Sequence, residues 1–339
     1  MPIQPFEMST ASILSIVGTT WNVASEKVDR SRVTRTTQSL AAEAAKELRE
    51  TASTRDQALH IMRDWIQKNN DIKNVRQDDA FLLRFLRHKK YSVPMAQQTL
   101  LKYLNLRKYY PEIFMKMDCE DENIQDIINN GYMAVSPVRD SKGRRVIIYN
   151  MSKFNASKLT CWDMCRVHTL IYESLLEDPI DQICGFTHVG DGSGVTGAHI
   201  TAWNPTDFAR VMKWGEQSMP MRHKECHLIN IPTAIKYIID FAKSKVTQKM
   251  VSRLHIHSSL KQLHKKVDVA CLPTIYGGEI PLQDMITFTK QLISDQRKKV
   301  LALDDMQILS TRGIISSRAK PGQNDTVSVE GSFRKLEID

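Results

Sequence analysis

The sequence contains few residues whose types and spacing could support catalysis or metal binding. His255 and His257 stand two apart in RLHIH (253–257), so a strand would place both on one face, where they could begin a metal site. Neither has a cysteine or carboxylate beside it at ligand spacing, and isolated histidines usually serve packing or surface roles. VGDGSGVTG (189–197) has the glycines of a phosphate-binding loop but lacks its Lys-Ser/Thr ending, so a turn explains it better. These patterns favour a protein that is not an enzyme and that holds no metal or cofactor.

A more informative group begins at Cys161. Cys161, Cys165, His168, Tyr172 and Leu175 follow at steps of four and three, so a helix would place them on one face. A solid core would favour Leu and Ile there, whereas most of these side chains are small, soft or polar-tipped. Two interpretations stay open: a core face whose His and Tyr find hydrogen-bond partners, or a cavity wall where His168 or Tyr172 meets a ligand's polar group.

The segment HLINIPTAIKYIIDFAKSKV (227–246) predicts an amphipathic helix that starts near Pro232. Its apolar stripe is wide and its polar edge is narrow, the edge being Lys236, Asp240 and Lys243. Such a helix either packs on an ordinary core or forms a movable cover over an apolar cavity.

Positive charge gathers around this helix. The formal net charge is +9, and the stretch from Arg222 to Arg253 holds seven Lys and Arg against only Glu225 and Asp240. Nucleic acid, an anionic membrane or a solvated face can each explain a basic patch. Its place beside an apolar helix favours a membrane over nucleic acid.

The composition predicts a cytoplasmic protein. The 339 residues are 42% hydrophobic, enough for a real core, and no run approaches the ~20 apolar residues that cross a bilayer. Six cysteines without a CxxC pair suit reduced, buried thiols.

Periodicity divides the chain into a helical unit and an α/β unit. Helices are expected over 38–69, 78–88 and 94–109, the second opened by Asp78 and Asp79. Strands are expected at 144–150, 183–189, 226–230 and 253–257, with helices at 160–177, 205–217 and 232–249 between them. This alternation predicts a mostly parallel sheet. The expected divisions are a flexible extension (1–36), a helical bundle (37–116), an α/β ligand-binding domain (117–303) and a flexible tail (304–339).

Four motifs in order resemble the CRAL-TRIO lipid-binding family, in the branch of tocopherol-transfer protein, retinaldehyde-binding protein and the clavesins. They are DDAFLLRFLRHKKY (78–91), GYMAVSPVRDSKGRRVIIYN (131–150), MPMRHKECHLINIP (219–232) and LPTIYGG (272–278). The resemblance spans about residues 45–300. It implies a helical bundle followed by an α/β domain whose sheet floors a hydrophobic pocket, closed by a gate helix at about 230–253.

The resemblance also implies two sets of site residues. The ligand pocket would be lined by Cys165, His168, Tyr172, Phe186, Gly190, Trp203, Val211, Trp214, Gly215, Cys226, Ile235 and Ile238. A phosphoinositide headgroup would bind in an exposed basic cleft made by Lys89, Arg222, Lys224, Lys249 and Arg253. The lining is bulkier and more polar at points than that of the tocopherol carrier, so a retinoid, another single-headed lipid or a phospholipid stays open beside tocopherol.

The expected function is a non-enzymatic carrier that takes a hydrophobic molecule from one membrane and releases it at a phosphoinositide-bearing one. Its membrane association would be peripheral and reversible. The alternative is a clavesin-like phosphoinositide adaptor in membrane traffic, for which a pocket ligand is incidental.

Overall fold

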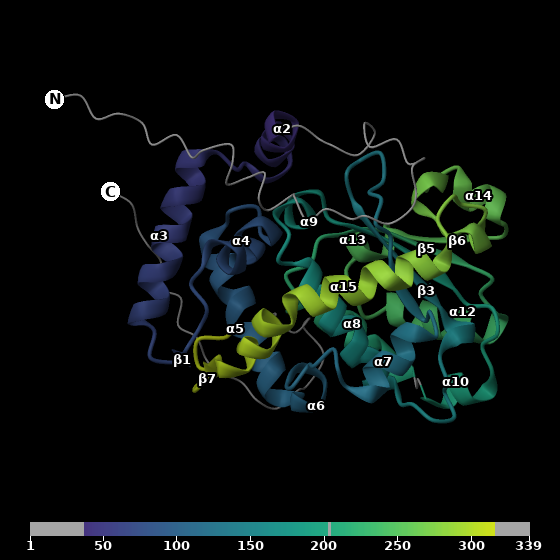
Figure 1. Cartoon of the computed structure of the whole chain (residues 1–339). Coiled ribbons are helices and arrows are strands. Elements are labelled where there is room, and N and C mark those ends of the chain that lie inside the picture. Colours follow the sequence, from purple (N-terminus) through teal and green to yellow (C-terminus); the bar gives the residue numbers. More distant parts are fainter. Residues whose placement is uncertain (1–36, 203–204, 316–339) are drawn as a thin grey trace. The chain divides into compact units, whose positions relative to one another are not determined.

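The computed structural model describes residues 37–202 and 205–315 (Figure 1). The helical unit contains α2 (Thr37–Leu48), α3 (Ala52–Lys68), α4 (Asp79–His88), α5 (Val93–Tyr109) and α6 (Pro111–Phe114), and α7 (Glu122–Asn129) follows at the start of the α/β unit. The single helix expected over 38–69 is wrong. Arg49 has φ of 65°, which ends α2, and Thr51 begins α3 with a capping box in which its Oγ1 accepts from the Thr54 amide at 3.1 Å.

The start of α4 is confirmed. Asp78 is the N-cap, and its side chain accepts a hydrogen bond from the Phe81 amide at 3.1 Å. After Lys89 the chain turns sharply, since Lys90 and Tyr91 both have positive φ. Lys89 therefore stands at the end of a helix whose buried face includes Phe81, Leu82 and Phe85.

The α/β unit is built on a five-stranded sheet, which confirms the predicted fold class. Its strands are β2 (Met133–Val135), β3 (Arg145–Asn150), β4 (Phe186–Asp191), β5 (His223–Ile229) and β6 (Leu254–His257), in that order across the sheet. Only β2 is antiparallel to its neighbour. It was not predicted as a strand, because its three residues are too few for periodicity to detect.

Helices fill the intervals between strands. They are α8 (Cys161–Leu175), α9 (Pro179–Cys184), α10 (Gly197–Ala202), α11 (Pro205–Gln217), α12 (Thr233–Lys243), α13 (Gln248–Val251), α14 (Leu260–His264) and α15 (Leu282–Leu301). Short 3₁₀ turns occupy Met151–Lys153, Val269–Cys271, Thr274–Tyr276 and Ala302–Asp305. The helix expected over 232–249 is two helices, because the chain leaves α12 after Lys243 and Thr247 caps α13. The unpredicted α15 lies along α8 and β2 (Figure 1).

The segment after residue 303 begins with ordered structure. Strand β7 (Gln307–Ile308) pairs antiparallel with β1 (Ile72–Lys73), and the side chain of Gln98 bonds the backbone of Gly313 and Ile315 at 2.8 Å each. The first part of the expected tail thus packs on the helical unit. The expected flexible ends, 1–36 and 316–339, lie outside the described residues.

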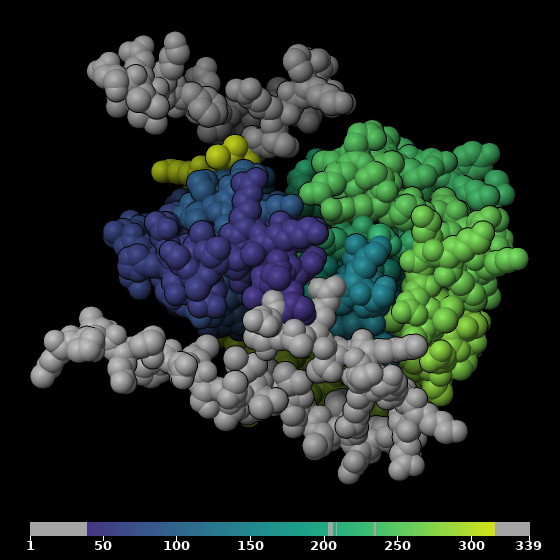
Figure 2. Space-filling view, turned by 90° about the horizontal axis from the view of Figure 1, so that it is seen from above, coloured from purple at the N-terminus to yellow at the C-terminus, as the bar shows by residue number. Residues whose placement is uncertain are grey.

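A buried ion cluster joins the two units, which lie side by side in Figure 2. The Arg84 guanidinium of α4 bonds Glu173 of α8 at 2.6 Å and also reaches Glu177; both Arg84 and Glu173 side chains are fully buried. Arg76 and Lys299 contact Glu177 at 2.9 and 3.3 Å. Burial alone would raise the pKa of Glu177, but Arg84 and Arg76 outweigh it and lower that pKa.

We expect Arg84→Met to lower the free energy of unfolding by about 3–5 kcal/mol, because it leaves Glu173 buried without its cation. Chemical denaturation measures this. The matched control is Arg55→Met, which breaks the exposed pair with Asp56 and should change stability by less than about 1 kcal/mol. Equal losses in the two variants would contradict the role assigned to the cluster.

Candidate functional site

One face of the sheet presents apolar side chains that remain partly accessible. Parallel pairing places Cys226 beside His188 and Leu228 beside Gly190. Cys226 and Leu228 are half-buried, although β5 is an internal strand with neighbours on both sides. On the opposite face, His227 and Ile229 are 0% and 1% exposed. One face of β5 is therefore packed, and the other is an accessible apolar floor.

A bulge in β5 lets this floor continue to the start of the strand. Phe186 pairs with His223, but the next residue, Thr187, pairs with Glu225, so Lys224 is the extra residue. In a regular strand, residues three apart face opposite ways. The bulge instead lets His223 and Cys226 share the accessible face.

Helix α8 meets the floor through a chain of hydrogen-bonded rings. His168 Nε2 lies 2.8 Å from the hydroxyl of Tyr132, and its Nδ1 lies 3.2 Å from the hydroxyl of Tyr172. The Tyr172 hydroxyl lies 2.8 Å from that of Tyr149 on β3. The predicted helical face therefore does bring His168 and Tyr172 together, and each has a protein partner.

The chain of rings continues across the strands. The Tyr149 hydroxyl contacts His188 Nδ1, and His188 Nε2 lies 2.8 Å from Nδ1 of His223. The imidazole of His168 also stacks on Tyr149, with ring centroids 4.9 Å apart. Sequence reasoning missed Tyr132, Tyr149, His188 and His223. His188 could have been found from the sequence, because it lies on the same face of β4 as Phe186 and Gly190. Both of those residues were expected to line the pocket.

Burial keeps the hydrogen-bonded rings uncharged. Desolvation lowers the pKa of His168 to about 4 and that of His223 to about 4, and it raises the pKa of Cys226 to about 12. The pKa of Tyr172 is also raised, chiefly by desolvation. Yet His168, Tyr172 and His223 each keep some accessible surface. The site therefore offers neutral hydrogen-bonding groups at an otherwise apolar surface.

Helix α12 has a buried side and an exposed side. Ile238, Ile239 and Ala242 are 8%, 5% and 3% exposed, and Ile235 is half-buried, whereas Tyr237 is 73% exposed. Among the described residues, the buried side chains of α12 lie outside the contiguous hydrophobic core. The helix instead lies against α11.

The other predicted pocket residues are placed unevenly. Phe186 is fully buried, and Val211 is half-buried. Trp214 packs on Tyr110, with ring centroids 3.9 Å apart, and so contacts the helical unit. A Cβ added at Gly190 would lie 2.8 Å from Leu228 Cδ2, while one at Gly215 would meet nothing within 4 Å. Trp203 lies outside the described residues.

Most of the predicted cleft cations interact electrostatically. Desolvation lowers the pKa of Lys249, and the nearby charges of Arg253 and Arg222 lower it further. The pKa of Lys89 is lowered by desolvation and by Lys102 and Lys249. These groups therefore belong to one positive region.

The expectation that every cleft cation is exposed is wrong for Arg222. Its side chain is 9% exposed and donates to the carbonyl oxygens of Gln182 and Ile183. Arg253 likewise donates to the carbonyl of His223. Arg222 and Lys224 also share a carboxylate partner, Glu47 of α2, at 3.1 and 2.6 Å. The residues of the predicted cleft thus include an acidic partner that the charge pattern did not reveal.

Comparison with known proteins agrees with this geometry. The CRAL/TRIO domain model matches residues 129–278, and the model of the Pinta-like, UBA domain matches residues 51–124. Residues 129–278 are therefore similar to the CRAL/TRIO domain. The resemblance inferred from the four motifs is confirmed.

Several relatives match most of the chain. Clavesin-1 of Xenopus laevis is 29% identical over 73% of this chain and 75% of its own length. Alpha-tocopherol transfer protein-like of Homo sapiens is 28% identical, with coverages of 77% and 76%. Clavesin-2 of Homo sapiens is 28% identical, with coverages of 74% and 77%.

The glycine-rich segment 189–197 contains the predicted turn after a strand, since β4 ends at Asp191 and α10 begins at Gly197. Asp191 closes β4 and accepts hydrogen bonds from the Ser193 amide at 2.9 Å, Asn230 Nδ2 at 3.0 Å and the Tyr276 hydroxyl at 3.0 Å. Tyr276 belongs to the LPTIYGG motif and Asn230 to the motif over 219–232. Two of the family motifs therefore meet at this carboxylate.

The pair His255 and His257 does lie on one strand face, with His227 beside it. Nδ1 of His227 lies 2.9 Å from Nε2 of His257, and the rings of His227 and His255 stack at 5.1 Å. Across residues 37–202 and 205–315, no group of three or more His, Cys, Asp or Glu side chains is arranged to hold a metal ion. In the same residues, no helix is long and apolar enough to span a bilayer.

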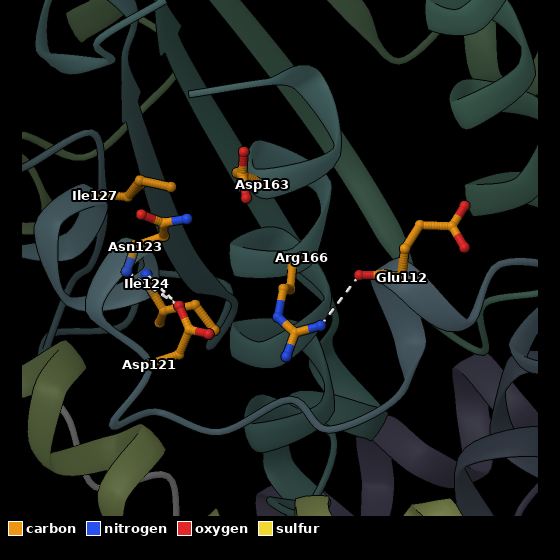
Figure 3. A pocket seen from close by; sticks show the side chains of 7 residues that line it. All are labelled: Glu112, Asp121, Asn123, Ile124, Ile127, Asp163 and Arg166. Carbon is orange, nitrogen blue, oxygen red and sulfur yellow. Dashed lines mark hydrogen bonds between the residues drawn. The ribbon is translucent and has the colours of Figure 1, made fainter. Parts of the chain in front are cut away.

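A separate pocket of about 260 Å³ lies beside α8 (Figure 3). Its lining is mostly polar, and Arg166 in it donates to the carbonyl of Glu112 at 3.0 Å. It contains no residue predicted for the ligand pocket or the cleft, so it is a distinct surface feature. Its lining residues are Glu112, Asp121, Asn123, Ile124, Ile127, Asp163 and Arg166.

The neutral histidines predict loss of stability in acid. The unfolded chain protonates histidine near pH ~6.5, whereas His168 and His223 in the fold protonate at about 4. Above ~6.5 they contribute no pH dependence; as pH falls from ~6.5 towards ~4 the unfolded state gains protons and stability is lost, on the order of 1–2 kcal/mol per histidine at pH 5. Urea unfolding at pH 7 and pH 5 measures this.

A variant pair tests the assignment. His168→Gln keeps hydrogen-bonding capacity without a titratable group and should reduce the difference between the two pH values. His60→Gln, on the exposed side of α3, should leave it unchanged. Stability that is the same at pH 7 and pH 5 would show that these rings are not held neutral.

Proposed function

We propose that this chain is a non-enzymatic cytoplasmic carrier that encloses one hydrophobic lipid and releases it at phosphoinositide-containing membranes. The observation that carries this proposal is the accessible apolar face of an internal strand, β5. Evolution normally fills such a face with packed side chains, because each buried methylene contributes about 0.8 kcal/mol. A lipid chain on this floor gains the same stabilisation.

The ring chain supports a ligand with one uncharged polar group. His168 and Tyr172 are neutral at pH 7 and keep accessible surface, so they can hydrogen-bond a hydroxyl or carbonyl without burying a charge. A tocopherol or a retinoid fits this description. The proposed contacts are Cys165, His168, Tyr172, Phe186, Gly190, Trp203, Val211, Trp214, Gly215, Cys226, Ile235 and Ile238.

Helix α12 is the proposed cover. Within the part of the chain that the structure describes, its buried side chains lie outside the main core, so its movement would leave the packing of that core in place. Its outer side carries Tyr237 and Phe241, which are 73% and 40% exposed and suit the interfacial region of a bilayer. The basic cleft of Lys89, Arg222, Lys224, Lys249 and Arg253 would bind the headgroup nearby.

We expect Ile235→Asp/Ile238→Asp to abolish retention of copurifying lipid while the protein stays folded, because both residues would face the ligand. Mass spectrometry of an organic extract and thermal unfolding measure the two effects. Tyr237→Asp/Phe241→Asp adds the same two charges on the exposed side and should retain the lipid. A double mutant at 235 and 238 that unfolds would make α12 part of the core, and one that folds and keeps its lipid would exclude a cover.

The same extract separates the carrier from an adaptor. A carrier copurifies with lipid near one molecule per chain. A wild-type protein that binds vesicles but yields no lipid would favour the clavesin-like adaptor.

Binding to phosphoinositides is tested best at the two lysines of the cleft for which no ion pair is seen among the described residues. Lys89→Ala/Lys249→Ala should weaken binding to vesicles containing phosphatidylinositol bisphosphate by roughly tenfold or more, since each cation near an anionic surface contributes about 1 kcal/mol. Flotation measures this, with phosphatidylserine vesicles matched for charge. The control Lys261→Ala/Lys265→Ala removes two exposed charges from α14 and its end.

Two results would count against the cleft. Equal loss of binding in the control variant would show that vesicle binding depends on the total charge of the protein and not on Lys89 and Lys249. Equal binding of the wild type to both vesicle types would leave a general basic patch without headgroup preference.

A further inference from the structure

Helix α2 precedes both matched family segments and rests on the α/β unit through few side chains. Ala44 and Leu48 are 3% and 0% exposed and pack with Ile183 and Cys184 at the end of α9. The buried members of this small cluster lie outside the main core, and Tyr91 packs against both. Helix α2 has 12 residues, a length at which an isolated helix is marginal in water. Its position therefore depends on these contacts and on its polar side chains.

Glu47 provides one polar contact of α2, and it lies in the proposed cleft. One oxygen, Oε2, lies 2.6 Å from Lys224 Nζ and 3.1 Å from Arg222 Nη2. The hydrogen bond from Lys224, together with the charges of Lys224, Arg222 and Lys90, lowers the pKa of Glu47 against a smaller effect of burial. Glu47 is therefore an ionised carboxylate between two of the five cations assigned to the headgroup.

We propose that Glu47 is the internal occupant of the anion site, and that a multiply phosphorylated headgroup must displace it and so detach α2. This inference rests on the proposed function, because the competing anion is the headgroup of that proposal. A carboxylate carries one negative charge, whereas each phosphate monoester carries about 1.5 to 2 near neutral pH. A bisphosphorylated headgroup therefore outcompetes Glu47, and the singly charged headgroup of phosphatidylserine does not. Glu47 thereby determines specificity.

The cleft is suited to such an exchange. Arg222 keeps its place without Glu47, because the carbonyls of Gln182 and Ile183 also hold its guanidinium. Lys89 and Lys249 have no ion pair within the described residues and can make the first contact with the incoming headgroup. Glu47 itself is 34% exposed and can be reached from solvent.

Cys184 reports the position of α2. Its side chain is 4% exposed and lies in the cluster with Ala44 and Leu48, so detachment of α2 uncovers the thiol. The rate of alkylation at Cys184, measured by mass spectrometry in the folded full chain, is compared with that at the fully buried Cys271. Without lipid, Glu47→Gln should accelerate alkylation of Cys184 alone by roughly three- to tenfold, the range for losing two partly exposed ion pairs.

The control variant is Glu120→Gln. Glu120 pairs with Arg297 at 2.9 Å, and that arginine keeps Asp118 as a second partner. The change removes the same charge without touching α2. It should leave the alkylation of Cys184 unchanged.

The second arm adds membranes. Vesicles with phosphatidylinositol bisphosphate should accelerate alkylation of Cys184 in the wild type, and charge-matched phosphatidylserine vesicles should not. Glu47→Gln should float with bisphosphate vesicles roughly three- to tenfold more tightly than wild type, because no internal anion competes. Soluble inositol trisphosphate distinguishes a free ligand from a lipid: release of α2 by the soluble compound and not by vesicles would overturn a membrane ligand.

The outcomes separate the inference from the proposed function. If the wild type binds bisphosphate vesicles while neither the affinity of Glu47→Gln nor the reactivity of Cys184 changes, the inference is wrong and the headgroup cleft stands. If neither protein binds these vesicles, flotation shows that the proposed cleft has failed, and the competition fails with it. If Glu47→Gln leaves Cys184 as protected as in the wild type without lipid, Glu47 does not hold α2.

Discussion

The buried ion cluster of Arg84, Glu173 and Glu177 is the interaction on which the arrangement of the sites depends. Removing a partner from such a cluster leaves an uncompensated charge without water, so α4 and α8 are held in one relation. Lys89 follows α4 and is thereby brought to the predicted cleft, while Tyr172 precedes Glu173 on α8 and bonds Tyr149 on β3. The ion cluster therefore positions one residue of the predicted cleft and one residue of the predicted pocket.

The molecule treats its two kinds of buried polar group differently. Between the units it pairs full charges, and at the floor it keeps His168, Tyr172 and His223 neutral through desolvation. If the floor were charged, covering it with an apolar ligand would remove those charges from water, which costs free energy. Neutral rings that bond one another can exchange one hydrogen bond for a bond to a ligand. In the proposed carrier, such an exchange would let an apolar site recognise one polar group of its ligand.

Periodicity was enough to predict four of the five strands of the sheet, the start of α4 at Asp78 and the amphipathic character of α12. It missed β2 and began the strand expected at 183–189 within α9. Periodicity could not predict local changes in the backbone. The positive φ of Arg49 divides the first expected helix, and the bulge at Lys224 changes which side chains of β5 share a face. Distant partners were beyond it as well. Glu47 lies 175 residues from Arg222 in the chain, and only the fold brings the carboxylate into a stretch that reads as basic. The charge of a segment predicts its partners poorly when the neutralising group comes from another element.

The bulge also explains how floor and cleft can share one strand. Arg222 and Lys224 both reach Glu47, while His223 between them turns to the other side and bonds His188. The carbonyl of His223 accepts a hydrogen bond from Arg253, another cation of the cleft. The backbone that carries the last ring of the neutral chain is thus hydrogen-bonded to a side chain of the positive region. Residues of both predicted sites therefore meet at the start of β5.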